Sequence, residues 1–372
     1  FGSAVLAATV AATGVLEMPY AFALTGWGVG CATLMLSATG HLVGMESLLQ
    51  TARASGKSSC YGIAVHLNFR VPRLISLCTS ALLLAWLCKC IGCLRGLIEA
   101  LNSSDEASTA EGFDFSGPNA LTLICLAFSL LLSFSPDLKS LRYLAVTSLA
   151  VCLLYLGVLF ARLWMRAGGF AIHPSVYFTT PHLATGRGLL KCGEGIARIF
   201  VAGIFTFNVL PLGAETSRAS VPSGMLLALI LLLAGGLLGY FLVGDGIGCS
   251  IGSTIAKDAF MQYASAALAL GLLLQVPLLM HPLRTVVEEA FVPARCQSAG
   301  QFRSVVAWSV AFLLLAGGLE LGLGSYGALL AGLVQCAAGS LVSLVIPGLM
   351  FFATPVGRLQ LASSRQTNVS VV

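Results

Sequence analysis

The chain has 372 residues, of which 57% are hydrophobic and 9% are charged, whereas soluble domains carry about 25% charged residues. Its 20 Lys and Arg and 15 Asp and Glu side chains are too few to cover a water-soluble body of this size, so lipid must surround most of the surface. The apolar runs do not alternate with period two, which excludes an outer-membrane barrel. The composition therefore predicts an all-α polytopic membrane protein. Its net charge of +5 is no sign of nucleic-acid binding, because the Lys and Arg residues of a membrane protein report its topology instead; we expect no nucleic-acid partner.

Apolar windows of about 20 residues, the length that a bilayer requires, predict about ten transmembrane helices. In chain order they lie near 2–24, 28–50, 73–99, 119–136, 141–165, 193–217, 224–248, 263–285, 304–323 and 327–353. We expect one transmembrane domain over 1–353 and a polar cytoplasmic tail over 354–372. Because Phe1 already belongs to an apolar run, we also expect that an amino-terminal segment precedes it.

The basic residues favour an orientation with both termini in the cytoplasm. Most Lys and Arg side chains then fall on inner loops, beginning with Arg53, Lys57 and Arg70, as the positive-inside rule requires. The acidic stretch 100–118 becomes an outer loop, while the basic residues between 166 and 192 depart from the rule. We therefore expect a multi-pass integral membrane protein, in either the plasma membrane or an internal membrane such as that of a vacuole.

Two of the ten spans contain residues that interrupt helices. The first span places Gly14, Glu17 and Pro19 within an apolar run, and the sixth places Asn208 and Pro211 at its centre. These two spans open successive groups of five. Proline removes a backbone donor and clashes with the preceding turn, so nearby backbone groups lose their helical partners. The pattern predicts discontinuous helices one and six, with ordinary proline kinks as the alternative.

A discontinuous helix inside a membrane has a chemical consequence. Unpaired backbone groups are costly in hydrocarbon, so non-helical backbone persists only where it is buried in protein or lines a wet cavity. The half-helices that start after Glu17 and after Leu210 present free amides and a positive dipole end, which suit a carboxylate. The two breaks therefore predict a binding site inside the membrane.

Motifs along nearly the whole chain resemble the amino acid/auxin permease family. Residues 14–23 (GVLEMPYAFA), followed by Thr25, Gly26 and Trp27, are similar to the first-helix signature of that family. Five further matches occur in the order of the family, at 135–143, 209–215, 239–245, 277–284 and 346–348. Single motifs of this kind are weak, but six in register are specific.

The resemblance implies a LeuT-type fold of five plus five helices in inverted repeat, with repeat one over about 2–165 and repeat two over about 193–353. It implies secondary active transport of amino acids or related small solutes by alternating access. It also implies that the backbone of helices one and six holds the substrate. The implied substrate-binding residues are Gly14, Val15, Leu16, Thr206, Phe207 and Asn208.

The chain departs from the family pattern in three places. It ends after ten predicted helices where the family usually has eleven, and Glu17 stands where a small residue is usual. Gln275 occupies the part of helix eight where sodium-coupled relatives carry a hydroxyl. Because Glu17 is ionisable at membrane depth, it is the candidate for proton coupling, with a purely structural carboxylate as the alternative. We expect a proton as the driving ion, with sodium as the alternative.

Other chemistries find less support in the sequence. The cysteines Cys88, Cys90 and Cys93 lie among apolar residues without zinc spacing, so no metal site and no cofactor are expected. The five histidines are scattered over different segments, which argues against an enzyme. The expected partners are an amino acid, the driving ion and membrane lipid. A non-transporting amino-acid sensor or scaffold with the same fold remains the alternative function.

Overall fold

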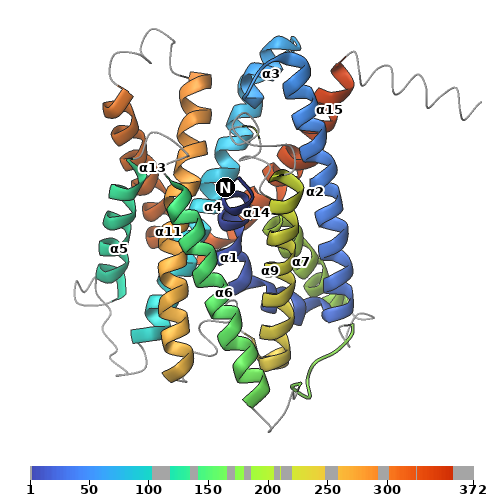
Figure 1. Ribbon diagram of the computed structural model, residues 1–372, viewed down its shortest axis with the longest axis vertical. Coiled ribbons are helices and arrows are strands. Elements are labelled where there is room, and N and C mark those ends of the chain that lie inside the picture. The colour runs from blue at the N-terminus through green and yellow to red at the C-terminus, as the bar shows by residue number, and fades with distance from the viewer. Residues whose placement is uncertain are drawn as a thin grey trace, which may run out of the picture.

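The computed structural model describes residues 2–102, 118–134, 141–165, 172–179, 186–204, 210, 220–247, 259–291, 301–323 and 325–354. Every regular element in these ranges is a helix, and none of them contains a strand. The long helices pack side by side into a bundle (Figure 1). The prediction of an all-α polytopic membrane protein is confirmed.

The predicted spans correspond to helices in the same order along the chain. Their bounds are α1 Gly2–Thr25, α2 Trp27–Ser55, α4 Pro72–Asn102, α5 Pro118–Ser133, α6 Arg142–Met165, α7 Gly186–Ala202, α9 Ser220–Val243, α11 Ala259–Phe291, α13 Gln301–Leu323 and α14 Ser325–Ser340, which continues through the π-helical turn η4 Leu341–Val345 into α15 Ile346–Ala353. Two short elements were not predicted, α3 Cys60–His66 and the 3-10 turn η3 Gly244–Gly246.

Length and composition allow eight of the described helical stretches to cross a membrane. They lie at Gly2–Thr25, Trp27–Ser55, Pro72–Leu101, Arg142–Met165, Ser220–Gly246, Met261–Phe291, Arg303–Glu320 and Leu330–Ala353. The helices α5 and α7 complete the set of ten, but their described lengths are only 16 and 17 residues. Leucine, valine and aromatic side chains on the outer faces of the helices are exposed, as lipid contact requires.

Helix α1 forms the centre of the bundle. Residues 5–19 are all buried, and α1 packs against α6, α7, α9 and α11 (Figure 1). Its many alanines let neighbouring backbones come close. The Thr9 and Thr13 hydroxyls donate to carbonyls of the preceding turn, Leu6 O at 2.7 Å and Val10 O at 3.4 Å. The helix therefore buries its polar side chains without leaving these hydroxyls unpaired.

The predicted break in helix one is wrong, because α1 continues as a helix through Gly14, Glu17 and Pro19. Proline removes only one donor, and the surrounding helices pack tightly around this turn. Gly235 of α9 lies so close that a Cβ added there would be 3.2 Å from Val15 Cα. Packing from all sides favours the helical backbone at this position, and the sequence of α1 alone does not encode those neighbours.

The sixth helix begins earlier than predicted, at Gly186 instead of 193, and ends at Ala202. A tight final turn follows, in which Gly203 N donates to Phe200 O at 3.3 Å and Ile204 N to Val201 O at 3.0 Å. His41 Nε2 of α2 lies 3.1 Å from Phe200 O and caps the helix end, because a carbonyl can only accept. The predicted break near 206–210 falls largely on residues 205–209, outside the described residues.

The segment 172–179 ties the ends of three helices together. Trp27 N at the start of α2 donates to Tyr177 O at 3.1 Å, and Tyr177 N donates to the Tyr240 hydroxyl of α9 at 3.0 Å. The Trp27 and Phe178 rings meet edge to face at 4.8 Å. Gly26, with φ +79°, makes the sharp turn between α1 and α2 against this segment. The contacts hold the ends of α1, α2 and α9 in one place.

Helix α11 contains Pro277, which frees the carbonyl of Leu273 four residues earlier. Ser129 Oγ of α5 donates to that Leu273 carbonyl at 3.0 Å. Two carbonyls of the same turn also receive a donor from another helix: Ser148 Oγ of α6 donates to Gly271 O and Cys90 Sγ of α4 to Leu272 O, both at 3.3 Å. Side chains of three neighbouring helices thus donate to the backbone carbonyls of the turn that the proline weakens.

A second proline, Pro347 in α15, frees the carbonyl of Ser343. The π-helical turn η4 contains that carbonyl. Gly44 of α2 packs directly against Ser343 O, at a distance that leaves no room for a side chain. Glycine at this position therefore allows α2 to approach the wide turn of the last span.

We expect Ser129→Ala to destabilise the protein by about 1 kcal/mol, because the Leu273 carbonyl loses its partner in an apolar environment. Ser133→Ala is the matched control, since the Ser133 hydroxyl bonds only its own helix, to Ser129 O at 2.8 Å. Thermal denaturation in detergent, followed with a thiol-reactive dye that reports exposure of buried cysteines, measures both variants. Equal melting temperatures for the two variants would contradict this account of the proline turn.

Candidate functional site

The first three predicted substrate-binding residues lie in the interior of the bundle. Gly14, Val15 and Leu16 are fully or almost fully buried in the middle of α1. Gly14 packs directly against the Leu232 side chain of α9, and Val15 packs against Gly235 of the same helix. In this conformation the face of α1 that carries Gly14 is closed by α9. The other three predicted residues, Thr206, Phe207 and Asn208, lie outside the described residues.

Glu17 forms an ion pair with Lys89, which projects from α4. The two side chains are only 9% and 15% exposed, so both charges are largely removed from solvent. The Cys93 thiol, one helical turn further along α4, lies 3.9 Å from Glu17 Oε1. The Lys89 ammonium also lies 5.3 Å from the centre of the Trp86 ring, a cation–π contact. The pair links the central helix to α4 at membrane depth.

A second cation, Arg198 of α7, interacts electrostatically with Glu17. Arg198 also pairs with Glu194 one turn earlier on α7, at 2.9 Å. Its guanidinium lies 5.0 Å from the centre of the Tyr20 ring of α1. Cys336 of α14 is within electrostatic range of both Lys89 and Arg198. We call Glu17, Lys89, Arg198 and Glu194 the charge cluster.

Sequence reasoning identified Glu17 but assigned no role to Lys89 or Arg198. Both cations were visible as charges inside predicted spans, where an ionisable group needs a counter-charge or a wet environment. That rule predicts a pairing but not the partner, because α1, α4 and α7 meet only in the folded bundle. Spacing along the chain therefore contains no signal for this cluster.

Gln275 of α11 connects two helices at the site where a hydroxyl was noted as missing. Its amide Nε2 donates to Thr9 O of α1 and to Thr13 Oγ1, the latter at 3.4 Å. Gln275 is fully buried, and its Oε1 makes no hydrogen bond with any described residue. The amide donor thus engages the two α1 oxygens that face α11 at this point.

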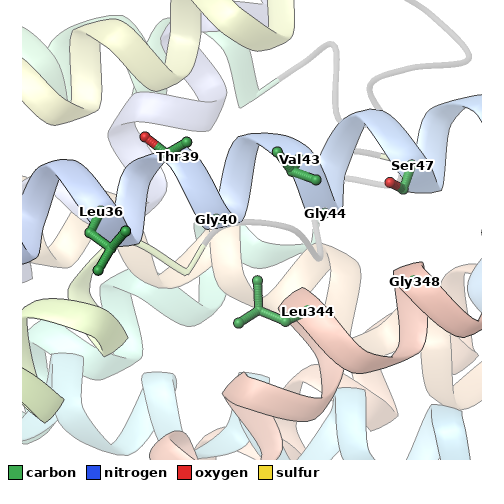
Figure 2. Close-up of a pocket in the computed structure, with 8 residues that line it drawn as sticks. All are labelled: Leu36, Thr39, Gly40, Val43, Gly44, Ser47, Leu344 and Gly348. Carbon is green, nitrogen blue, oxygen red and sulfur yellow. The ribbon is translucent and has the colours of Figure 1, made fainter. Parts of the chain in front are cut away.

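A groove of about 340 Å³ lies elsewhere, between α2 and the η4–α15 end of the last span (Figure 2). Its lining consists of apolar and small polar residues: Leu36, Thr39, Gly40, Val43, Gly44, Ser47, Leu344 and Gly348. Of the predicted site residues, those that the structure describes do not contribute to it. The described lining residues carry no charge that could pair with the ammonium or carboxylate of an amino acid.

Metal-binding chemistry has no support in the described part of the chain. Within those ranges no group of three His, Cys, Asp or Glu side chains lies close enough to hold a metal ion. Cys88 and Cys90 donate instead to backbone carbonyls of α13 and α11, at 3.8 Å from Ala316 O and 3.3 Å from Leu272 O. These thiols act as small packing residues with weak hydrogen bonds.

Comparison with known proteins agrees with this architecture. Residues 2–355 match the sequence profile of the family described as transmembrane amino acid transporter protein. The chain is also similar to vacuolar amino acid transporter 5 of Schizosaccharomyces pombe. The two sequences are 27% identical over 371 residues, an alignment that covers 93% of this chain and 82% of the yeast protein.

We expect Lys89→Met to destabilise the protein by on the order of 3 kcal/mol, because it leaves the Glu17 carboxylate buried beside an apolar side chain. Glu17→Gln leaves Lys89 unpaired and should have a similar effect. The double variant Glu17→Gln/Lys89→Met removes both charges and should recover most of the lost stability. Thermal denaturation of the three variants measures the coupling. Additive effects of the two single changes would contradict a direct ion pair.

Proposed function

This chain belongs to the transmembrane amino acid transporter protein family, and on that premise we propose that it moves amino acids across a membrane by proton-coupled secondary active transport. Alternating access between two inverted repeats, over about 2–165 and about 193–353, provides the mechanism. The observation that carries the proton-coupling part is the buried ion pair between Glu17 and Lys89 on the central helix. An ionisable pair at this depth is costly to maintain, which favours a functional role.

We propose that the substrate binds against the backbone of Gly14, Val15 and Leu16, with Thr206, Phe207 and Asn208 on the opposite wall. Gly14 lacks a side chain and faces Leu232, so movement of α9 away from α1 would expose the Gly14 backbone. Glu17 lies about one turn after Gly14 on α1, and Arg198 of α7 interacts with Glu17 electrostatically. Charges of both signs near the site suit an amino acid, which carries an ammonium and a carboxylate.

Proton coupling through Glu17 follows from the same contacts. When Glu17 binds a proton, its attraction to Lys89 is lost and the link between α1 and α4 weakens. The freed Lys89 ammonium can then pair with a substrate carboxylate. Proton loss restores the ion pair and expels that carboxylate. Binding of proton and substrate thus favour each other, which is the requirement for symport.

Gln275 supports a proton over sodium as the coupled ion. A sodium ion between helices one and eight needs oxygen ligands with free lone pairs. Here the Gln275 amide donates to Thr9 O and Thr13 Oγ1, so a hydrogen-bond donor and not a cation lies beside these two oxygens. The Gln275 side chain thus connects α11 to α1 by hydrogen bonds, a connection that needs no cation.

The test of proton coupling is uptake of labelled amino acids into proteoliposomes with an acidic exterior. A gradient of one pH unit supplies about 1.4 kcal/mol per proton, enough for roughly tenfold accumulation. We expect wild type to concentrate its substrate under this gradient with or without sodium. Glu17→Gln, which removes the titratable group and leaves Lys89 free to pair with a substrate carboxylate, should retain exchange of substrate across the membrane but lose accumulation.

Two results would contradict the coupling proposal: sodium dependence at fixed pH, or accumulation by a Glu17→Gln variant under the proton gradient. A protein that binds amino acids but shows neither uptake nor exchange would instead favour the sensor or scaffold alternative. Amino-acid-dependent thermal stabilisation detects such binding independently of transport.

We expect Gly14→Val to abolish uptake. Because valine would also overpack the core, a control variant must separate loss of stability from loss of substrate binding. Valine at this position meets Leu232, and overpacking of a core typically costs about 1–3 kcal/mol. Gly14→Val/Leu232→Ala restores room, so its melting temperature should recover towards that of Leu232→Ala alone. Uptake should remain lost in the double variant if the Gly14 backbone contacts the substrate. Normal uptake by a double variant of recovered stability would show that the Gly14 backbone does not contact the substrate.

A further inference from the structure

Glu320 is a buried carboxylate that lies outside the charge cluster. It lies in the last turn of α13 and is 8% exposed. It makes no hydrogen bond or ion pair with any residue that the structure describes. An ionised carboxylate without a close counter-charge is costly inside a membrane, so such a residue is a candidate for a functional role.

Glycine at position 92 makes room for this carboxylate on the surface of α4. A Cβ added to Gly92 would lie 2.6 Å from Glu320 Oε1 and 3.0 Å from its Cδ. The same α13–α4 contact includes the Cys88 thiol, which donates to Ala316 O one turn before Glu320. Small residues at positions 88 and 92 therefore seat the last turn of α13 against α4.

Glu320 and Glu17 approach the same turn of α4 from two helices. Glu320 contacts Gly92, and Glu17 contacts Cys93, the next residue. Successive Cα atoms are about 3.8 Å apart, so the two carboxylates lie against adjacent positions of the same turn of α4. The Cys93 thiol interacts electrostatically with both carboxylates.

The charged and titratable groups around Glu320 come from α4. Arg95 interacts electrostatically with the Glu320 carboxylate. The Glu320 carboxylate in turn interacts electrostatically with the Cys88 and Cys93 thiols. No charged group from the described parts of α5, α11 or α14, which also pack against α13, is among those that act on it. Arg95 itself pairs with Glu99 at 2.7 Å, and these two side chains are 28% and 46% exposed. Exposure thus increases from Glu320 towards the end of α4.

We infer that Glu320 is a second proton-binding residue, which passes protons between the exposed end of α4 and the ion pair of Glu17 with Lys89. The inference rests on the proposed proton coupling and extends it to α13. In the transfer, the Cys93 thiol is the relay: its S–H bond breaks as an O–H bond forms on the Glu17 carboxylate, and the O–H bond of the Glu320 carboxylic acid breaks as a new S–H bond forms on Cys93. Glu320 becomes an anion near Arg95, Lys89 loses its anionic partner, and the total charge stays constant.

The test compares proton influx and substrate exchange in proteoliposomes that contain a pH-sensitive dye. Substrate-dependent proton influx in Glu320→Gln should fall by at least about tenfold, equivalent to about 1.4 kcal/mol of added barrier. Exchange of labelled amino acid at equal pH should stay within about twofold of wild type, because glutamine keeps the shape of the side chain. Glu320→Asp should retain part of the proton influx.

Two further variants separate this role from a structural one. Glu46→Gln removes a carboxylate on α2 that accepts from Gln50 at 3.3 Å, and it should leave proton influx unchanged. Gly92→Ala displaces the Glu320 carboxylate without removing it, and it should slow influx like Glu320→Gln. Wild-type influx in a stable Glu320→Gln variant would overturn the role of Glu320 while leaving the proposed function intact. Absence of proton influx in wild type would overturn the proposed proton coupling itself.

Discussion

The hydrocarbon layer contains no water, so each backbone carbonyl and amide within it must find a partner in the protein. This constraint explains why all described elements are helices, and it can be followed at two of the prolines. At Pro277 the freed Leu273 carbonyl accepts from Ser129 of α5. At Pro347 the freed Ser343 carbonyl lies in a π-helical turn against Gly44 of α2. At Pro277 another helix thus supplies the missing hydrogen bond, and at Pro347 the backbone widens where a glycine of another helix leaves room.

The same constraint determines how the central helix is packed. Because α1 is surrounded by protein, its buried residues apart from Glu17 are small or apolar, and Thr9 and Thr13 donate within their own helix. Gly14 and Gly235 bring α1 and α9 into close contact. A face closed only by side-chain packing can open when one helix moves, whereas a face closed by backbone hydrogen bonds cannot do so without unfolding. The interface of α1 with α9 is therefore suited to a conformational change.

Charge provides the other organising feature of the bundle. The helix α4 carries Lys89 towards Glu17 on one face and accommodates Glu320 at Gly92 on a neighbouring face. Arg198 of α7 adds a second cation beside Glu17. Ionisable groups at this depth change their interactions strongly when a single proton is gained or lost, because the surrounding dielectric is low. Small changes in protonation can thus alter the contacts among α1, α4, α7 and α13.

The sequence by itself determined the membrane class, the order of the spans and the family, because apolar length and local motifs are properties of contiguous residues. It also identified Glu17 as an unusual buried charge. Only the tertiary structure decided that α1 stays helical through Pro19, because the helices that pack around it come from distant parts of the chain. Likewise, only the folded bundle brings Lys89, Arg198 and Glu320 around Glu17, since electrostatic partners depend on distance in space and not along the sequence.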